Sequence, residues 1–234
     1  MGDPDLPERL FADPVWHALQ TQHQRFAVAS GRARRYPAEV APFATVAEPT
    51  TEALMELRSL LAPGESVWLS GPGYPQAPGL KHEGVLECLQ MALPERAVLG
   101  QSEVDLKRVS ASDASDLVAL TDLAFPGFFR THTYQMGTYY GVYAGGELIA
   151  MGGERLKLDG YYEISAVCTH PQHRGKGLAA SIIWKLVHDH RREGVVSWLH
   201  VGAANLRAIE LYNRLGFKEV RRVILHRISR AASA

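Results

Sequence analysis

A glycine-punctuated stretch, residues 169–179 (THPQHRGKGLA), constrains the fold of this chain more than any other segment. It follows an apolar segment typical of a strand, residues 164–168, and it opens an amphipathic segment typical of a helix. A turn between a strand and a helix N-terminus leaves backbone N–H groups unpaired at the positive end of the helix dipole. The stretch therefore predicts a binding site for an anion, most naturally a phosphate group.

The length of the chain limits the number of domains, and its charge limits the kinds of ligand that it can bind. The 234 residues suit one large domain or two small ones. Acidic and basic residues balance at 25 each, so no net charge points to nucleic acid. The balance is uneven, because residues 170–230 hold 12 Lys and Arg against 4 Asp and Glu. A basic region around a phosphate-binding turn fits a polyanionic small ligand, although solvated helix faces account for part of this charge.

Other features argue against metal, membrane and disulfide chemistry. The two cysteines, Cys88 and Cys168, lie far apart and lack the spacing of a metal site or a disulfide framework. The first residues are acidic and contain prolines, without the apolar core of a signal peptide, and no apolar run reaches bilayer-spanning length. We expect a cytoplasmic protein that binds no metal, no membrane and no nucleic acid.

Hydrophobic periodicity predicts a mixed α/β sheet, since strands alternate with helices. The expected helices cover residues 14–30, 50–61 (capped by Thr51), 112–124 (capped by Ser112) and 177–192, with a short one after Asn205. The expected strands cover residues 66–70, 85–93, 104–109, 161–168, 195–201 and 217–228, with a hairpin over 137–155 around Gly145 and Gly146. A break at residues 94–101 predicts a boundary between an N-terminal region, 1–100, and a domain at 101–234.

Two motifs give this pattern a family resemblance. The run Gln172-x-x-Gly175-x-Gly177 is similar to the acyl-CoA signature Gln/Arg-x-x-Gly-x-Gly/Ala of the GCN5-related N-acetyltransferase (GNAT) superfamily. Downstream, Asn205, Ala208, Tyr212 and Gly216-Phe217 resemble a second segment of the same superfamily. The resemblance covers residues 104–228, and residues 163–171 resemble its glycine N-acyltransferase-like branch. It implies a mostly antiparallel central sheet with splayed fourth and fifth strands, flanked by helices and preceded by a divergent α/β N-terminal half.

The resemblance also implies that acetyl-CoA is the co-substrate. Gly175 and Gly177 would let the N–H groups from Arg174 to Ala179 approach the pyrophosphate, and the alternative is a glycine turn that serves only the connection. The exposed main chain of the fourth strand would pair with the amides of the pantetheine arm. The residues implied in cofactor binding are Val167, Cys168, Thr169, Gln172, His173, Arg174, Gly175, Lys176, Gly177, Leu178, Ala179 and Asn205.

Two residues are candidates for catalysis. Tyr212 lies where the family has its general acid, and a phenol is suited to protonate the CoA sulfur. Glu163 is the candidate base, because an apolar sheet would raise its pKa toward a useful range. The alternatives are that Tyr212 only packs, that Glu163 is an ion-paired strand carboxylate, and that Asn205 only caps its helix. Aromatic residues of the segment 125–140 are candidates for the wall of the acceptor pocket.

The resulting hypothesis is an acyl-CoA-dependent N-acyltransferase that transfers acetyl to a primary amine of a small molecule or amino acid, by direct attack in a ternary complex. Two alternatives stay open: a non-catalytic acyl-CoA-binding or sensing protein on the same scaffold, and an acetyltransferase of protein N-termini or lysines. The N-terminal region has no second Gln-x-x-Gly-x-Gly turn. This region is expected to shape or cover the acceptor site or to form a homodimer contact.

Overall fold

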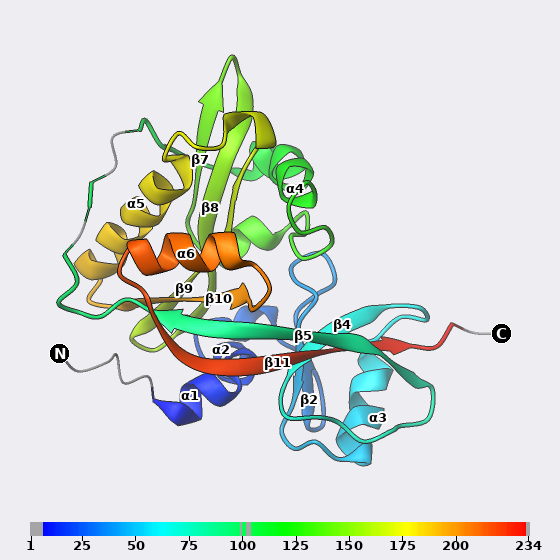
Figure 1. Cartoon of the computed structure of the whole chain (residues 1–234). Helices are drawn as coiled ribbons and strands as arrows, with labels where there is room; N and C mark the ends of the chain where they lie inside the picture. The colour runs from blue at the N-terminus through cyan, green and yellow to red at the C-terminus, as the bar shows by residue number, and fades with distance from the viewer. Residues whose placement is uncertain (1–6, 99, 102–103, 233–234) are drawn as a thin grey trace.

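The computed structural model (Figure 1) describes residues 7–98, 100–101 and 104–232. Its largest element is an eight-stranded sheet in the order β4-β11-β5-β10-β9-β8-β7-β6, accompanied by a three-stranded sheet, β1-β2-β3. Among the described strands of the large sheet, only β9 and β10 pair in parallel, and every other neighbouring pair is antiparallel. The expected mixed, mostly antiparallel sheet is confirmed.

The strands of the large sheet are β4 (Ser66–Ser70), β5 (Leu80–Ala92), β6 (Lys107–Arg108), β7 (Tyr139–Ala144), β8 (Glu147–Leu158), β9 (Tyr161–Thr169), β10 (Val196–Gly202) and β11 (Lys218–Arg230). The small sheet contains β1 (Val28–Ser30), β2 (Ala33–Arg35) and β3 (Ala44–Val46). The α-helices are α1 (Glu8–Ala12), α2 (Pro14–Gln20), α3 (Thr51–Leu60), α4 (Ala114–Asp122), α5 (Leu178–Arg192) and α6 (Leu206–Arg214). Short 3₁₀ segments are η1 (Gln24–Phe26), η2 (Ala111–Asp113), η3 (Thr133–Met136) and η4 (Pro171–His173).

Helix α5 packs against the sheet and follows the glycine turn of residues 174–177. It begins after Gly177 and ends before Gly194, both of which have positive φ (75° and 70°). Its apolar stripe is buried, with Ile182, Ile183 and Leu186 at 0% exposure, and each such side chain stabilises the fold by about 1.5–3 kcal/mol. None of the helices in the described residues is long and apolar enough to cross a bilayer.

The large sheet joins distant parts of the chain. Strand β5 lies between β10 and β11, so that Ala92 pairs with both Trp198 and Lys218. Figure 1 shows β5 and β11 running side by side from the part that carries α5 and α6 to the part that carries α3. The boundary predicted at residues 94–101 falls between β5 and β6 in the order of the chain, and it stays a prediction.

The helix expected over residues 14–30 is much shorter, because α2 ends at Gln20 and the last expected turn is strand β1. The reason is His23, which turns into the core instead of continuing the helix. Its Nδ1 lies 2.9 Å from Oη of Tyr36 and its Nε2 lies 3.1 Å from the carbonyl oxygen of Met136. These partners lie far along the chain, so tertiary contacts override the local helical pattern.

Two expected caps are shifted by one or two residues. Helix α3 is capped by Thr50 instead of Thr51, since Oγ1 of Thr50 accepts a hydrogen bond from the backbone N–H of Ala53 at 3.2 Å. The segment before α4 begins with a capping box made by Ser110 and Asp113, not with Ser112. The hairpin around Gly145 and Gly146 is confirmed as β7 and β8.

Candidate active site

Strands β9 and β10 separate in the middle of the sheet. They pair only where residues 196–198 face residues 161–163. Beyond Glu163, β9 continues to Thr169 and β10 continues to Gly202 without pairing to each other. The expected splay of these strands is confirmed. An opening of this kind leaves strand main chain free to pair with an extended ligand.

A bulge in β9 directs side chains into this opening. The register passes from Met151 opposite Cys168 to Gly153 opposite Ser165, so one residue of β8 faces two residues of β9. One of the two, Ala166, has φ of 55°, a conformation that side-chain-bearing residues rarely adopt. As a result the consecutive residues Ser165, Ala166 and Val167 all line one cavity.

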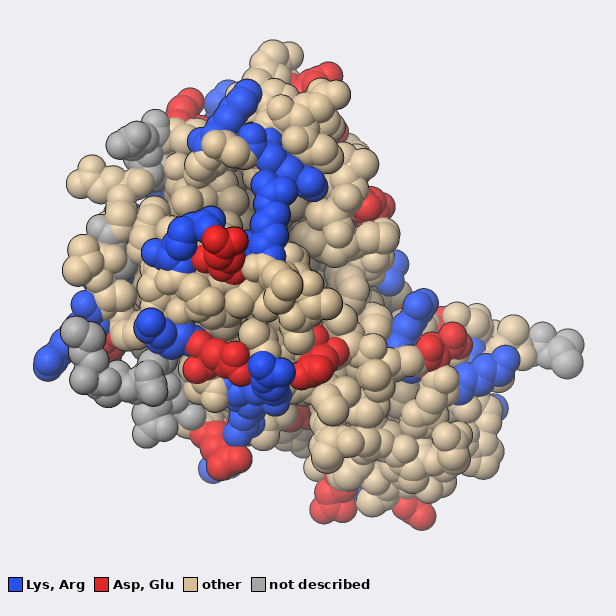
Figure 2. All heavy atoms as spheres, viewed as in Figure 1, with Lys and Arg blue, Asp and Glu red and all other residues tan. Residues whose placement is uncertain are grey.

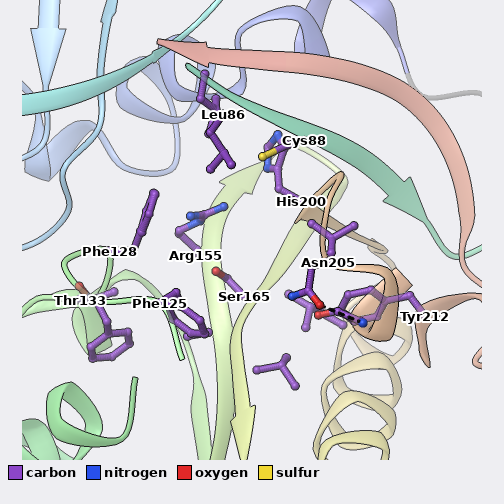
Figure 3. Close-up of a pocket in the computed structure, with 18 of the residues that line it drawn as sticks. Leu86, Cys88, Phe125, Phe128, Thr133, Arg155, Ser165, His200, Asn205 and Tyr212 are labelled. Atoms are coloured by element: carbon purple, nitrogen blue, oxygen red, sulfur yellow. Dashed lines mark hydrogen bonds between the residues drawn. The ribbon is translucent and has the colours of Figure 1, made fainter. Parts of the chain in front are cut away.

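This cavity has a volume of about 290 Å³ and lies between the splayed strands and α6 (Figure 3). Asn205 and Tyr212 of α6 face it from one side, and Phe125 and Phe128 face it from the other. Further lining residues are Leu86, Cys88, Phe129, Thr133, Tyr139, Arg155, Ile164, His200, Val201, Gly202, Ala208 and Leu225. Four aromatic residues of the expected segment therefore line the cavity, whereas His132 and Tyr134 do not.

The β9–α5 turn has the geometry expected of an anion site. Gly175 and Gly177 have φ of 82° and 75°, and a Cβ on either would meet no atom within 4 Å. Within the part of the chain that the structure describes, the N–H groups of residues 175–180 have no hydrogen-bond partner. Six open donors at a helix N-terminus fit a pyrophosphate. Figure 2 shows Lys and Arg atoms gathered above α6 on the same face.

The other residues implied in cofactor binding surround this turn. Gln172 and His173 lie in η4, and Nε of Arg174 donates to the carbonyl oxygen of Thr169 at 3.3 Å. Lys176 is exposed, while Leu178 and Ala179 begin α5. Val167 lines the cavity, whereas Cys168 is not among its lining residues and packs in an apolar cluster with Leu117 and Leu120. Burial raises the pKa of Cys168 to about 12, so this thiol is no nucleophile at neutral pH.

Asn205 and Tyr212 present polar atoms to the cavity from α6. Oδ1 of Asn205 accepts a hydrogen bond from the N–H of Ala208 at 3.2 Å, so Asn205 caps the helix as well as lining the cavity. Tyr212 is 8% exposed and its ring packs edge-on against Phe217. Its hydroxyl has no hydrogen-bond partner among the described residues. Burial raises the pKa of Tyr212 to about 12, so the phenol keeps its proton at neutral pH.

The expectation of a raised pKa for Glu163 is wrong. Burial alone would raise it, but the charge of Arg155 and a hydrogen bond from His200 outweigh burial and lower the pKa to about 2. Nε of Arg155 donates to Oε2 of Glu163 at 2.9 Å, and Nδ1 of His200 donates to Oε1 at 2.8 Å. The backbone N–H of Leu156 also donates to Oε2, at 3.2 Å. Glu163 is thus a buried, ion-paired carboxylate with its oxygens occupied, as the alternative interpretation held.

Arg155, Ser165 and His200 line the cavity although the sequence did not predict them there. A signal for Arg155 was present, because Asp159-Gly160 is a hairpin turn that brings residues just before it opposite residues just after it. The bulged register between Glu154 and Lys157 then decides which residue meets Glu163. Among the described residues, no group of His, Cys, Asp or Glu side chains could hold a metal ion.

Comparisons with known proteins agree with this geometry. The family model of FR47-like protein matches residues 139–225, the segment that contains the cavity strands, the turn and α6. A solved structure from Novosphingobium aromaticivorans, assigned to the GNAT family of acetyltransferases, is 32% identical with a TM-score of 0.85. It covers 96% of this chain and 99% of its own. No match was found among curated proteins.

More distant structures share the fold. A GCN5-related N-acetyltransferase from Kribbella flavida is 18% identical, with a TM-score of 0.63 over 98% of this chain and 97% of its own. A GCN5-related N-acetyltransferase-like protein from Streptococcus suis is 13% identical, with a TM-score of 0.59 over 93% and 95%. From the turn, the splayed strands and the likeness along almost the full length, the chain belongs to the GNAT family of acetyltransferases.

Proposed function

We propose that this protein is an acyl-CoA-dependent N-acyltransferase that transfers acetyl from acetyl-CoA to a primary amine of a small molecule or amino acid. The observation that carries the proposal is that the glycine turn and the cavity both adjoin the separated strands β9 and β10. The unpaired N–H groups of residues 175–180 lie where β9 leads into α5, and the cavity with the Tyr212 phenol lies between β9 and β10. A ligand with phosphates at one end and a reactive group at the other fits both features.

Each part of the site has a task in this reaction. The N–H groups of residues 175–180 bind the pyrophosphate, and the main chain of residues 167–169 pairs with the pantetheine amides. Acetyl-CoA supplies the activated acyl group. The neutral amine attacks the thioester carbonyl carbon, the C–N bond forms and the C–S bond breaks. Tyr212 donates its proton to the leaving sulfur. Water takes the proton that the amine loses, because Glu163, with its pKa lowered to about 2, is too weak a base, and a proton from water then restores the Tyr212 phenol.

The size of the cavity favours a small acceptor over a protein. About 290 Å³ lies at the lower end of the range of small-molecule pockets, and aromatic side chains cover much of its wall. The glycine N-acyltransferase-like branch remains the part of the superfamily that residues 163–171 resemble.

The test combines a binding and a turnover measurement on the full chain. Isothermal titration calorimetry measures acetyl-CoA binding, and release of the free CoA thiol measures turnover with a panel of amino acids, alkylamines, arylalkylamines and lysine-containing peptides. We expect acetyl-CoA binding and thiol release with a subset of the small amines. Release with peptides only would identify a protein acetyltransferase. Binding without any turnover would identify a non-catalytic acyl-CoA-binding protein, and no binding would overturn the proposal.

A further inference from the structure

We propose that the acceptor carries a carboxylate, which binds to Arg155, Tyr139 and Ser165, together with an apolar body that packs against the phenylalanines of residues 125–129. This inference rests on the proposed function and names its substrate class: amino acids with apolar side chains, as opposed to plain amines. It is carried by three donors of the cavity that have no acceptor of their own.

Arg155 is held rigidly with one edge open. Its Nε and Nη2 both donate to Glu163, which fixes the plane of the guanidinium. The guanidinium also lies over the Phe43 ring, with Cζ 4.7 Å from the ring centroid. Its third nitrogen, Nη1, has no hydrogen-bond partner among the described residues, and the side chain lines the cavity. Figure 3 shows Arg155 reaching into the space between Phe128 and His200.

The second donor, the hydroxyl of Tyr139, is buried without a partner. Tyr139 is 1% exposed and lines the cavity, and its Oη has no hydrogen-bond partner in the described part of the chain. A buried polar group in this state is costly unless a ligand satisfies it. Tyr139 and Arg155 line the same cavity, from the adjacent strands β7 and β8.

The third donor, the hydroxyl of Ser165, belongs to the same row of the sheet. Gly153 of β8 pairs with Tyr139 on one side and with Ser165 on the other, so the three residues lie across adjacent strands. The Ser165 hydroxyl has no partner among the described residues, and Figure 3 shows it directed into the cavity below Arg155. Three neighbouring N–H and O–H donors in an apolar pocket match the oxygens of a carboxylate.

The charge and the shape of the cavity favour an acceptor whose side chain is apolar. Glu163 is 0% exposed and is not among the residues that line the cavity, whereas its ion-pair partner Arg155 is. The open edge that faces a ligand is therefore positive. Phe125, Phe128 and Phe129 form the adjoining wall, which suits an apolar side chain and offers no partner for a charged one.

The test compares acceptors that differ only in the carboxylate. The pairs are L-phenylalanine and phenethylamine, L-leucine and 3-methylbutylamine, and glycine and methylamine, each measured for thiol release and for binding by calorimetry. We expect the carboxylate member to have a kcat/KM about 100-fold higher in the two apolar pairs, since buried donors left without an acceptor penalise the analogue that lacks the carboxylate. Equal or better turnover of the plain amines would overturn the carboxylate site while leaving the acyltransferase intact.

Variants of the chain give a second, independent readout. Tyr139→Phe and Ser165→Ala each remove one donor without touching the ion pair, and we expect a rise of about tenfold in KM for phenylalanine and none for phenethylamine. Tyr134→Phe, on the same segment but outside the cavity, is the matched control. Arg155→Lys is expected to abolish the carboxylate preference; if it does not fold, the two milder variants decide. Binding of phenylalanine that depends on these donors, without turnover, would support the site and contradict the acyltransferase. Equal effects of the variants on both members of a pair would overturn the site.

Discussion

The ring of Tyr139 lies directly over Gly153, the residue that pairs with it on the neighbouring strand. A Cβ on Gly153 would lie 2.2 Å from Cδ1 of Tyr139 and 2.7 Å from the carbonyl oxygen of Thr138. The absence of a side chain at Gly153 therefore decides where the phenol of Tyr139 is held, and with it one wall of the cavity.

Gly153→Ala should displace the Tyr139 ring. Because the clash includes backbone, we expect a loss of about 1–3 kcal/mol in the free energy of unfolding and weaker acceptor binding. Acetyl-CoA affinity should stay unchanged, since the phosphate turn lies elsewhere. Urea denaturation and calorimetry with both ligands check this. Gly145→Ala in the β7–β8 turn is the control for ligand binding only, because it meets no atom within 4 Å but is strained at φ of 61°. Unchanged stability of Gly153→Ala would contradict the close packing.

Gly177→Ala should weaken acetyl-CoA binding at least tenfold. Alanine at φ of 75° is strained by about 1–2 kcal/mol, and relief of that strain would reorient the N–H groups that we propose to bind the pyrophosphate. Gly194→Ala is a matched control, because Gly194 has φ of 70°, lies at the other end of α5 and also has open space around it. Both variants should lose similar stability, and only Gly177→Ala should lose affinity in calorimetry. Equal affinities would remove the turn from the binding site.

Tyr212→Phe should lower kcat about 100-fold while acetyl-CoA binding persists, as expected for loss of a general acid. Since the pKa of Tyr212 is raised to about 12, the wild-type pH profile should show no loss of activity from this phenol below about pH 10. Tyr74→Phe is the control, because its hydroxyl donates to the carbonyl oxygen of Ser70 and lies outside the cavity. Wild-type turnover in Tyr212→Phe would assign this residue to packing alone.

Acid should destabilise the fold mainly below pH 4.5. The pKa values of Glu154 and Glu163 are lowered from 4.5 to about 2: burial raises them, but the ion pairs and hydrogen bonds with His190, Lys157, Arg155 and His200 lower them further. A lowered acid pKa means stability that is present above 4.5 and is lost as pH falls through 2. Each carboxylate should contribute about 3 kcal/mol in this window.

Two other buried groups, Asp13 and His23, change the free energy of unfolding in opposite directions at higher pH. Burial raises the pKa of Asp13 to about 6, so its contribution is full below 3.8 and is lost as pH rises through 6. Burial lowers the pKa of His23 to about 4, so its contribution is present above 6.5 and is lost as pH falls through 4. Urea denaturation should therefore give nearly constant stability between pH 7 and 5 and a steep fall below 4.5. A fall that is complete by pH 5 would contradict the assignment to the two glutamates.

Local sequence was sufficient for the elements that depend on neighbours in the chain. Helix α5 follows from its apolar stripe between Gly177 and Gly194, and the β7–β8 hairpin follows from Gly145-Gly146. The family resemblance added the splay of β9 and β10, which residue patterns alone do not reveal. Together the local patterns and the resemblance locate the β9–α5 turn and Tyr212.

The rest depends on contacts that periodicity does not encode. The pKa of Glu163 is set by Arg155 from the bulged β8 and by His200 from β10, and no local pattern predicts that bulge. The end of α2 depends on His23 reaching Tyr36 and Met136. The strand expected at residues 104–109 is reduced to Lys107–Arg108, because it pairs only at the edge of the sheet.

The position of β5 also has a consequence for the order of assembly. Its two sheet neighbours, β10 and β11, are more than a hundred residues further along the chain. As the polypeptide leaves the ribosome, both edges of β5 stay without their native partners until β10 and β11 have been synthesised. Sheet closure is then a late event that joins distant parts of the chain, and β5, with Leu89 and Met91 among its core residues, is exposed to mispairing before it.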